Sequence, residues 1–121
     1  MKVFIDTNFL VDLIRFRIDI EKISELVSGY KLFVLSSNIF ELKKIARNRG
    51  ESGKLAKAAL KLIKLKKINI LKIEEDPDKA FLNLADKNTI IATNDSELRK
   101  KLKKNGIKTI YLRGNKKLEV G

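Results

Sequence analysis

The sequence predicts an α/β protein in which helices cover both faces of a sheet, a three-layer α/β/α sandwich. Two apolar stretches, residues 2–5 and 89–92, lack the polar and apolar alternation of a strand with one exposed face. Such stretches are typical of strands buried on both faces, as in a parallel sheet whose crossovers are helices. Predicted strands and helices also alternate from one end of the chain to the other. Together these observations favour one domain spanning residues 1–121.

The first predicted strand, residues 2–5, leads into a short helix, which the spacing of apolar residues over 9–14 predicts and which is expected to end in the region of residues 15–17. Asp19 is a candidate N-cap for a second helix that runs to about residue 28, and Gly29 would end it. Residues 31–35 are apolar again and form the second predicted strand.

Asn38, with the two serines before it, is expected to cap the next helix, which Gly50 ends. The inward face of that helix is expected to contain Ile39, Phe40, Leu42, Ile45 and Ala46. Ser52 and Gly53 are predicted to be the most flexible position of the chain. A strong helix follows over residues 54–67, where lysines surround an apolar face that includes Leu65.

Residues 68–73 alternate as a strand, and Asp76 and Pro77 open a helix through residue 85, with Asp at the N-cap and Pro at the first helical position. A basic helix over residues 96–105, stopped by Gly106, follows the strand at 89–92. The last predicted strand is residues 107–112, and residues 113–121 are predicted to be a mobile tail.

Composition limits the chemistry that the protein can perform. The 121 residues contain neither cysteine nor histidine, which excludes disulfides, thiolate metal sites and the commonest general base. Catalysis would therefore use carboxylates, hydroxyls, amides, lysines or a hard metal ion held by oxygen. No long apolar run or signal-peptide pattern is present, so we expect a soluble, cytoplasmic protein that does not bind membranes.

Positive charge is concentrated in the middle of the chain. The formal net charge is +12, and residues 43–72 contain eleven basic residues against one acidic residue, Glu51. A solvated lysine face is the usual interpretation of such a run, and a membrane-surface helix is a weaker one, but a polyanion such as RNA would also explain it. The candidate RNA contacts are Lys43, Arg47, Lys57, Lys61 and Lys64.

Two predicted strands end in similar polar clusters. Asp6, Thr7 and Asn8 follow the first strand, and Thr93, Asn94 and Asp95 follow the strand at 89–92. Ligands of parallel sheets bind beyond the carboxyl ends of the strands, so the clusters would meet at one crevice. The alternative is that Asp6 and Asp95 only cap the helices that follow them.

Three short motifs resemble the successive signatures of the PIN-domain nucleases. They are Ile5-Asp6-Thr7-Asn8, Ser37-Asn38-Ile39-Phe40-Glu41-Leu42 and Ala92-Thr93-Asn94-Asp95, and they occur in the family's order along nearly the whole chain. The resemblance implies a parallel five-stranded sheet and cleavage of single-stranded RNA that depends on Mg²⁺ or Mn²⁺. It places Asp6, Glu41 and Asp95 at the acidic positions, with Thr7, Asn8, Thr93 and Asn94 as supporting polar groups.

The sequence departs from this family at the helix before the Thr-Asn-Asp strand, where a further Asp is expected. One alignment puts Lys79 there, and counting back from Asp95 puts Asp78 there instead. One helical position is about 100° of rotation, so the alignments imply different sites. We favour Asp78 as a fourth acid and interpret Asp76 as the cap alone.

Oxygen-only ligation by several carboxylates suits Mg²⁺ or Mn²⁺, because a cation relieves the repulsion that raises carboxylate pKa values. The predicted function is a metal-dependent endoribonuclease, and the alternative is a degenerate PIN domain that binds RNA without cleaving it. A toxin with an antitoxin partner, a processing enzyme with a ribosome-assembly partner, and a homodimer all remain open.

Overall fold

The computed structural model describes residues 1–121, and its centre is one six-stranded sheet. The order of the strands is β3-β2-β1-β4-β5-β6, with the first five parallel and β6 antiparallel to β5. The strands are β1 (Lys2–Ile5), β2 (Lys31–Leu35), β3 (Asn69–Leu71), β4 (Thr89–Ala92), β5 (Lys108–Arg113) and β6 (Lys117–Val120). The five parallel strands agree with the prediction, and β6 is an addition to it.

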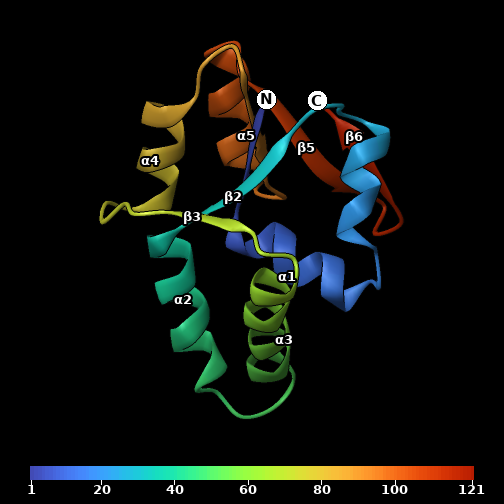
Figure 1. Cartoon of the computed structure of the whole chain (residues 1–121), viewed down its shortest axis with the longest axis vertical. Coiled ribbons are helices and arrows are strands. Elements are labelled where there is room, and N and C mark those ends of the chain that lie inside the picture. The colour runs from blue at the N-terminus through green and yellow to red at the C-terminus, as the bar shows by residue number, and fades with distance from the viewer.

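Helices cover both faces of this sheet, which confirms the predicted three-layer α/β/α sandwich (Figure 1). They are α1 (Thr7–Arg15), the 3₁₀ helix η1 (Ile20–Glu25), α2 (Ser36–Ala46), α3 (Glu51–Leu65), α4 (Pro77–Leu84) and α5 (Ser96–Lys104). Most buried residues of α1, η1, α2 and α3 belong to a cluster of 18 residues, and most of those of α4 and α5 belong to a second cluster of 8. None of the helices combines the length and apolar character needed to span a bilayer.

Strand β1 contributes to both clusters, as its uniformly apolar sequence predicted. Val3 and Ile5 belong to the larger cluster, whereas Phe4 belongs to the smaller one. The ring of Phe4 lies 5.3 Å from that of Phe33 and 6.4 Å from that of Phe81. Successive side chains of a strand point to opposite faces of the sheet, so β1 packs into the core on both faces.

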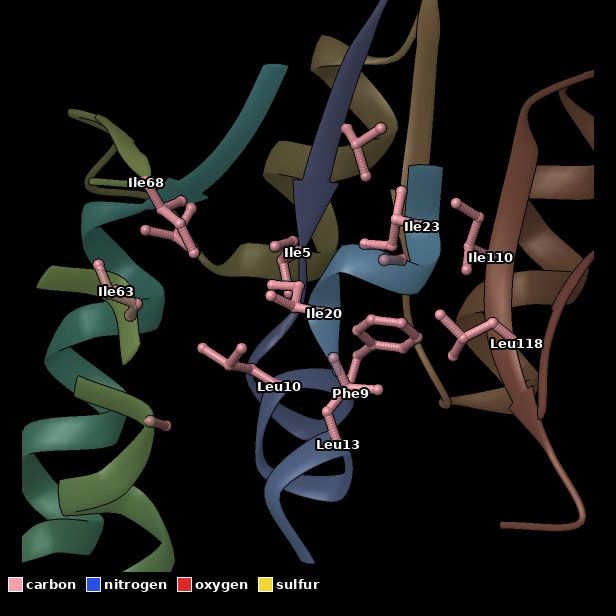
Figure 2. Packing of buried hydrophobic residues seen from close by; sticks show 14 of the residues in the cluster. Ile5, Phe9, Leu10, Leu13, Ile20, Ile23, Ile63, Ile68, Ile110 and Leu118 are labelled. Carbon is pink, nitrogen blue, oxygen red and sulfur yellow. The ribbon is translucent and has the colours of Figure 1, made fainter. Parts of the chain in front are cut away.

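Helix α1 fixes the position of the larger cluster against β1. Figure 2 shows Phe9, Leu10 and Leu13 of α1 pointing toward Ile5 and toward side chains of η1 and β5. Phe9 has no solvent exposure, and replacement of such a residue by alanine typically costs about 3–5 kcal/mol. This packing holds the first turn of α1, which contains the polar cluster after β1, in place.

The prediction of a mobile tail over residues 113–121 is wrong. Residues 117–120 form β6, which pairs with β5 from Ile110 opposite Val120 to Arg113 opposite Lys117. Gly114 and Asn115, both with positive φ, make the tight turn between the strands. Leu118 is buried in the larger cluster, so the hairpin is stabilised by core packing that local composition did not reveal.

Three expectations about the helices also need correction. The segment after Asp19 is the short 3₁₀ helix η1. Gly53 lies inside α3 and is buried, and a Cβ there would collide with the carbonyl oxygen of Asn48, so the first turn of α3 packs closely against the backbone of the loop that follows α2. Phe40 and Leu65, predicted on inward faces, are exposed by 62% and 78%.

Candidate active site

Strands β1 and β4 are adjacent, so the polar clusters that follow them, residues 6–8 and 93–95, lie next to each other at the edge of the sheet. The register pairs Ile5 with Ala92, and the Asp6 amide donates to the Ala92 carbonyl at 2.9 Å. Thr93 therefore begins next to Asp6 at the carboxyl edge of the parallel sheet, where such sheets bind ligands.

Asp6 caps α1 and also lies at the base of the site. Its Oδ1 accepts from the Thr7 amide at 2.9 Å, and its Oδ2 accepts from the Thr93 hydroxyl at 2.8 Å. The side chain is almost fully buried, and this burial is the main cause that raises the pKa of Asp6 from 3.8 to about 6. The two hydrogen bonds oppose the rise, and the charges of Asp78 and Glu41 add to it. The capping and functional interpretations of Asp6 are therefore compatible.

Asn38 connects the acidic groups of β1 and α2. Its amide nitrogen lies 3.4 Å from Asp6 Oδ1, 3.1 Å from Thr7 Oγ1 and 3.4 Å from Glu41 Oε1, and donates to them. Its carbonyl accepts from the Leu35 amide at 3.2 Å, so the side chain secures the start of α2 from inside the helix. The predicted N-cap role is wrong in position, because Leu35 is the N-cap residue.

Glu41 lies one helical turn after Asn38, on the same face of α2. Its Oε1 accepts from the Thr7 hydroxyl at 3.2 Å as well as from Asn38. These contacts hold an otherwise exposed carboxylate against the first turn of α1.

Asn94 joins β4, α1 and β5 through three hydrogen bonds. Its backbone amide donates to Asn8 Oδ1 at 3.1 Å, and its side-chain amide donates to Asp12 Oδ2 at 2.9 Å. Its side-chain carbonyl accepts from the Leu112 amide at 2.8 Å. Asn94 thus orders the structure behind the site.

Asp95 is the N-cap of α5. Its Oδ1 accepts from the amides of Glu97 and Leu98 at 3.0 and 3.2 Å. Its Oδ2 makes no hydrogen bond to the protein, and the residue lines the same cleft as Asp6. One oxygen caps the helix while the other remains available to a ligand.

These groups surround an open cleft of about 460 Å³. Its lining contains six acidic residues and one basic residue, Arg15, whose guanidinium lies 2.9 Å from Asp12. The acidic residues are Asp6, Asp12, Glu41, Asp76, Asp78 and Asp95. The cleft is therefore strongly negative in a protein of strongly positive net charge.

The structure places Asp78, and not Lys79, in the lining of the cleft. Burial raises the pKa of Asp78, and the charges of Asp76 and Asp95 raise it further, while Lys101 acts in the opposite direction. Asp76 makes no capping hydrogen bond with its side chain and lines the cleft too, so its interpretation as a cap alone is wrong.

The donor chemistry of the cleft fits a hard divalent cation, since all its candidate ligands are oxygens. No group of three or more acidic side chains is arranged to hold one ion. Mg²⁺ is commonly bound by one or two carboxylates and several waters, so convergence of three is not required of this metal.

The cleft brings together most of the predicted site residues. Asp6, Thr7, Asn8, Glu41, Asp78 and Asp95 line it, and Thr93 and Asn94 support it through hydrogen bonds. Sequence reasoning missed Asp12, Arg15 and Asp76 as lining residues and Asn38 as a link between the acids. Asn8, Asp12 and Arg15 occur at i, i+4 and i+7, and this polar stripe on α1 was the available signal.

The predicted RNA-binding residues lie elsewhere. Lys43 and Arg47 are exposed on and just after α2, and Lys57, Lys61 and Lys64 are exposed on α3. Helices α2 and α3 lie side by side at the end of the molecule farthest from both termini (Figure 1). None of the five residues lines the cleft.

Comparisons with known proteins agree with this geometry. A family model described as a PIN-like domain matches residues 3–115. Ribonuclease VapC4 of Methanocaldococcus jannaschii is 34% identical, over 98% of this chain and 95% of the relative. Ribonuclease VapC9 of Archaeoglobus fulgidus is 31% identical, over 96% of this chain and 86% of the relative.

Solved structures share the fold at lower identity. The PIN domain endonuclease Utp24 superposes with a TM-score of 0.77 at 22% identity, over 98% of this chain and 90% of the other. VapBC-1 of nontypeable Haemophilus influenzae gives a TM-score of 0.55 at 18% identity, over 86% and 94% of the two chains. At these identities the likeness concerns the fold alone.

Proposed function

Because the chain belongs to the PIN-domain family, we propose that it is a divalent-metal-dependent endoribonuclease that hydrolyses phosphodiester bonds in single-stranded RNA. The observation that carries the proposal is the buried carboxylate of Asp6, whose ionised form is opposed by its burial and by Glu41 and Asp78. A cation bound in the cleft would favour ionisation of all three groups. Two relatives that are named ribonucleases support the proposed substrate class.

Asp6, Glu41, Asp78 and Asp95 would hold Mg²⁺ or Mn²⁺ in this proposal. Such a cation would polarise the scissile phosphate and lower the pKa of an attacking water, so the proposed hydrolysis would not require histidine. Thr7 and Thr93 orient the carboxylates that they contact. Asn8 and Asn94 keep the ends of β1 and β4 in register behind them.

The test is a cleavage assay on fluorescently labelled single-stranded RNA with Mn²⁺ or Mg²⁺, with and without chelator, beside Asp6→Asn as the matched variant. Metal-dependent internal cleavage by the wild type alone is the expected result. Cleavage that survives both chelator and Asp6→Asn would contradict the proposal.

A PIN domain that binds RNA without cleaving it is the second candidate. The absence of three convergent carboxylates favours it. RNA binding by a wild type that shows no cleavage with either metal would establish it.

The exposed residues Lys43, Arg47, Lys57, Lys61 and Lys64 are proposed to attract the RNA backbone, since neutralised phosphates release counterions. The protein would act in the cytoplasm, where such RNA is present. An antitoxin, a ribosome-assembly factor and a second copy of the chain are the proposed protein partners. Purification from its source, with mass analysis of bound proteins, separates these roles.

A further inference from the structure

A second, basic pocket begins directly after the acidic cleft along α5. It has a volume of about 240 Å³, and the side chains of its lining include three cations and no carboxylate. The carboxyl oxygen of Gly121, which also lines it, accepts from the amide and the hydroxyl of Thr109 at 3.0 and 3.1 Å. The lining residues are Ser96, Arg99, Lys100, Lys103, Thr109, Tyr111 and Gly121, and we call this site the α5 pocket. Its charge is opposite to that of the cleft at the other side of Asp95.

The guanidinium of Arg99 is held in this pocket without an acidic partner. It lies 4.1 Å from the centre of the Tyr111 ring, a cation–π contact. The Tyr111 hydroxyl donates to Glu119 Oε2 at 3.0 Å, which fixes the ring. The buried Nε of Arg99 has no hydrogen-bond partner, so the aromatic ring, and no acceptor of the protein at this atom, holds the guanidinium at the pocket.

The lysines of the pocket are unpaired as well. Neither Lys100 nor Lys103 forms an ion pair, and the salt bridges of the molecule all lie outside the pocket. Three unpaired cations around one hollow favour an anionic ligand, and a guanidinium fork matches the oxygens of a phosphate.

We propose that the α5 pocket binds a backbone phosphate of the single-stranded RNA whose neighbouring segment lies in the acidic cleft. The RNA identity of the ligand rests on the proposed function. Asp95 lines the cleft and Ser96 lines the pocket. With a rise of 1.5 Å per residue, Arg99 and Lys103 lie about 6 and 12 Å from Asp95 along the helix axis, so one strand can reach both sites.

The affinity of labelled single-stranded RNA, measured by fluorescence anisotropy over a range of salt concentrations, tests this pocket. Chelator is present throughout, so binding is read without cleavage. Lys103→Gln and Arg99→Gln should each reduce the log-log salt slope by about 0.7, the value for one neutralised phosphate on a single strand. Lys104→Gln is the matched control, because Lys104 is exposed on α5 but does not line the pocket. Equal slopes for Lys103→Gln, Lys104→Gln and wild type would overturn the proposal.

Nitrogen-15 spectra provide a direct readout at Arg99. The Nε–H signal, assigned by its loss in Arg99→Lys, should shift on addition of RNA and remain in place at an equal concentration of inorganic phosphate. An equal shift with both would mean a general phosphate pocket and would overturn the RNA assignment. Lys103 is exposed, so Lys103→Gln keeps the test valid even where Arg99→Gln disturbs folding.

The two proposals fail in different ways. A wild type that binds RNA through the α5 pocket but never cleaves it would reject the nuclease and leave this inference standing. A wild type that cleaves RNA, with a salt slope that substitution of Arg99 and Lys103 does not change, would reject the α5 pocket and leave the proposed nuclease standing.

Discussion

The acidic cleft and the α5 pocket are neighbours with opposite electrostatics. The cleft combines six carboxylates with Arg15, whereas the pocket combines Arg99, Lys100 and Lys103 with no acidic side chain. Asp95 and Ser96, adjacent in sequence at the start of α5, belong one to each site. The net charge of +12 therefore conceals two local surpluses of opposite sign.

The two sites also differ in how their charged groups are held. Asp6 is surrounded by donors from Thr7, Asn38 and Thr93, and these fix its position before any cation arrives. Arg99 is positioned by one aromatic ring and leaves its Nε without a partner. This difference suits a site for chemistry beside a site for holding a strand, because catalysis requires preorganised groups.

The largest expected effect is on cleavage by Asp6→Asn. The amide keeps the shape and the capping acceptor but removes the charge proposed to hold the cation, so we expect the rate to fall on the order of a thousandfold, about 4 kcal/mol of transition-state stabilisation. Single-turnover cleavage with saturating Mn²⁺ measures it. An Asp6→Asn protein that is folded by circular dichroism and cleaves normally would make Asp6 a cap alone.

The next effect is the pH dependence of stability without metal. The raised pKa means that the folded state binds the Asp6 proton more tightly than the unfolded state does. Stability from this group is present below about pH 4, declines as the pH rises, and is lost above about pH 6, a total of about 3 kcal/mol.

Urea unfolding of wild type and Asp6→Asn between pH 4 and pH 7, with chelator, measures this contribution as the difference between the two proteins. The wild type should lose stability relative to Asp6→Asn as the pH rises. Added Mg²⁺ should restore the wild type selectively, since a ligand of the folded state stabilises it. Parallel pH profiles would mean that Asp6 is not held in a destabilised charged form.

The third effect distinguishes two neighbouring residues of α4. Asp78→Asn should reduce cleavage and metal affinity about 10- to 100-fold, the range typical of residues that support a metal site. Lys79→Ala should change both little, because Lys79 does not line the cleft. Calorimetric titration with Mn²⁺ beside the cleavage assay measures both quantities. An Asp78→Asn enzyme with wild-type behaviour would leave a site of three acids, Asp6, Glu41 and Asp95.

The sequence was sufficient for the features that depend on local pattern. Uniformly apolar strands predicted the parallel sheet, and polar residues directly after β1 and β4 predicted where Asp6 and Asp95 would meet. Contacts across elements were not predictable in the same way. Asn38 looked like a cap, but its amide reaches Asp6 and Thr7 only because β1 and β2 are adjacent. Leu118 was predicted to lie in a mobile tail, because the residues that pack around it in the larger cluster are distant in the sequence.

The smallest expected effect concerns the exposed lysines of α3, which lie outside both sites. Replacement of Lys57, Lys61 and Lys64 by Gln should reduce the salt slope of RNA binding by about 0.7 for each phosphate that is no longer neutralised, with no change in the cleavage rate at saturating RNA. Anisotropy titrations beside those of the α5 pocket measure it. A slope that responds to Lys103→Gln but not to these three changes would restrict the RNA path to α5, and the lysines of α3 would then be a solvated face. A response to both would mean that the strand extends from the pocket across the cleft toward the α2–α3 end of the molecule.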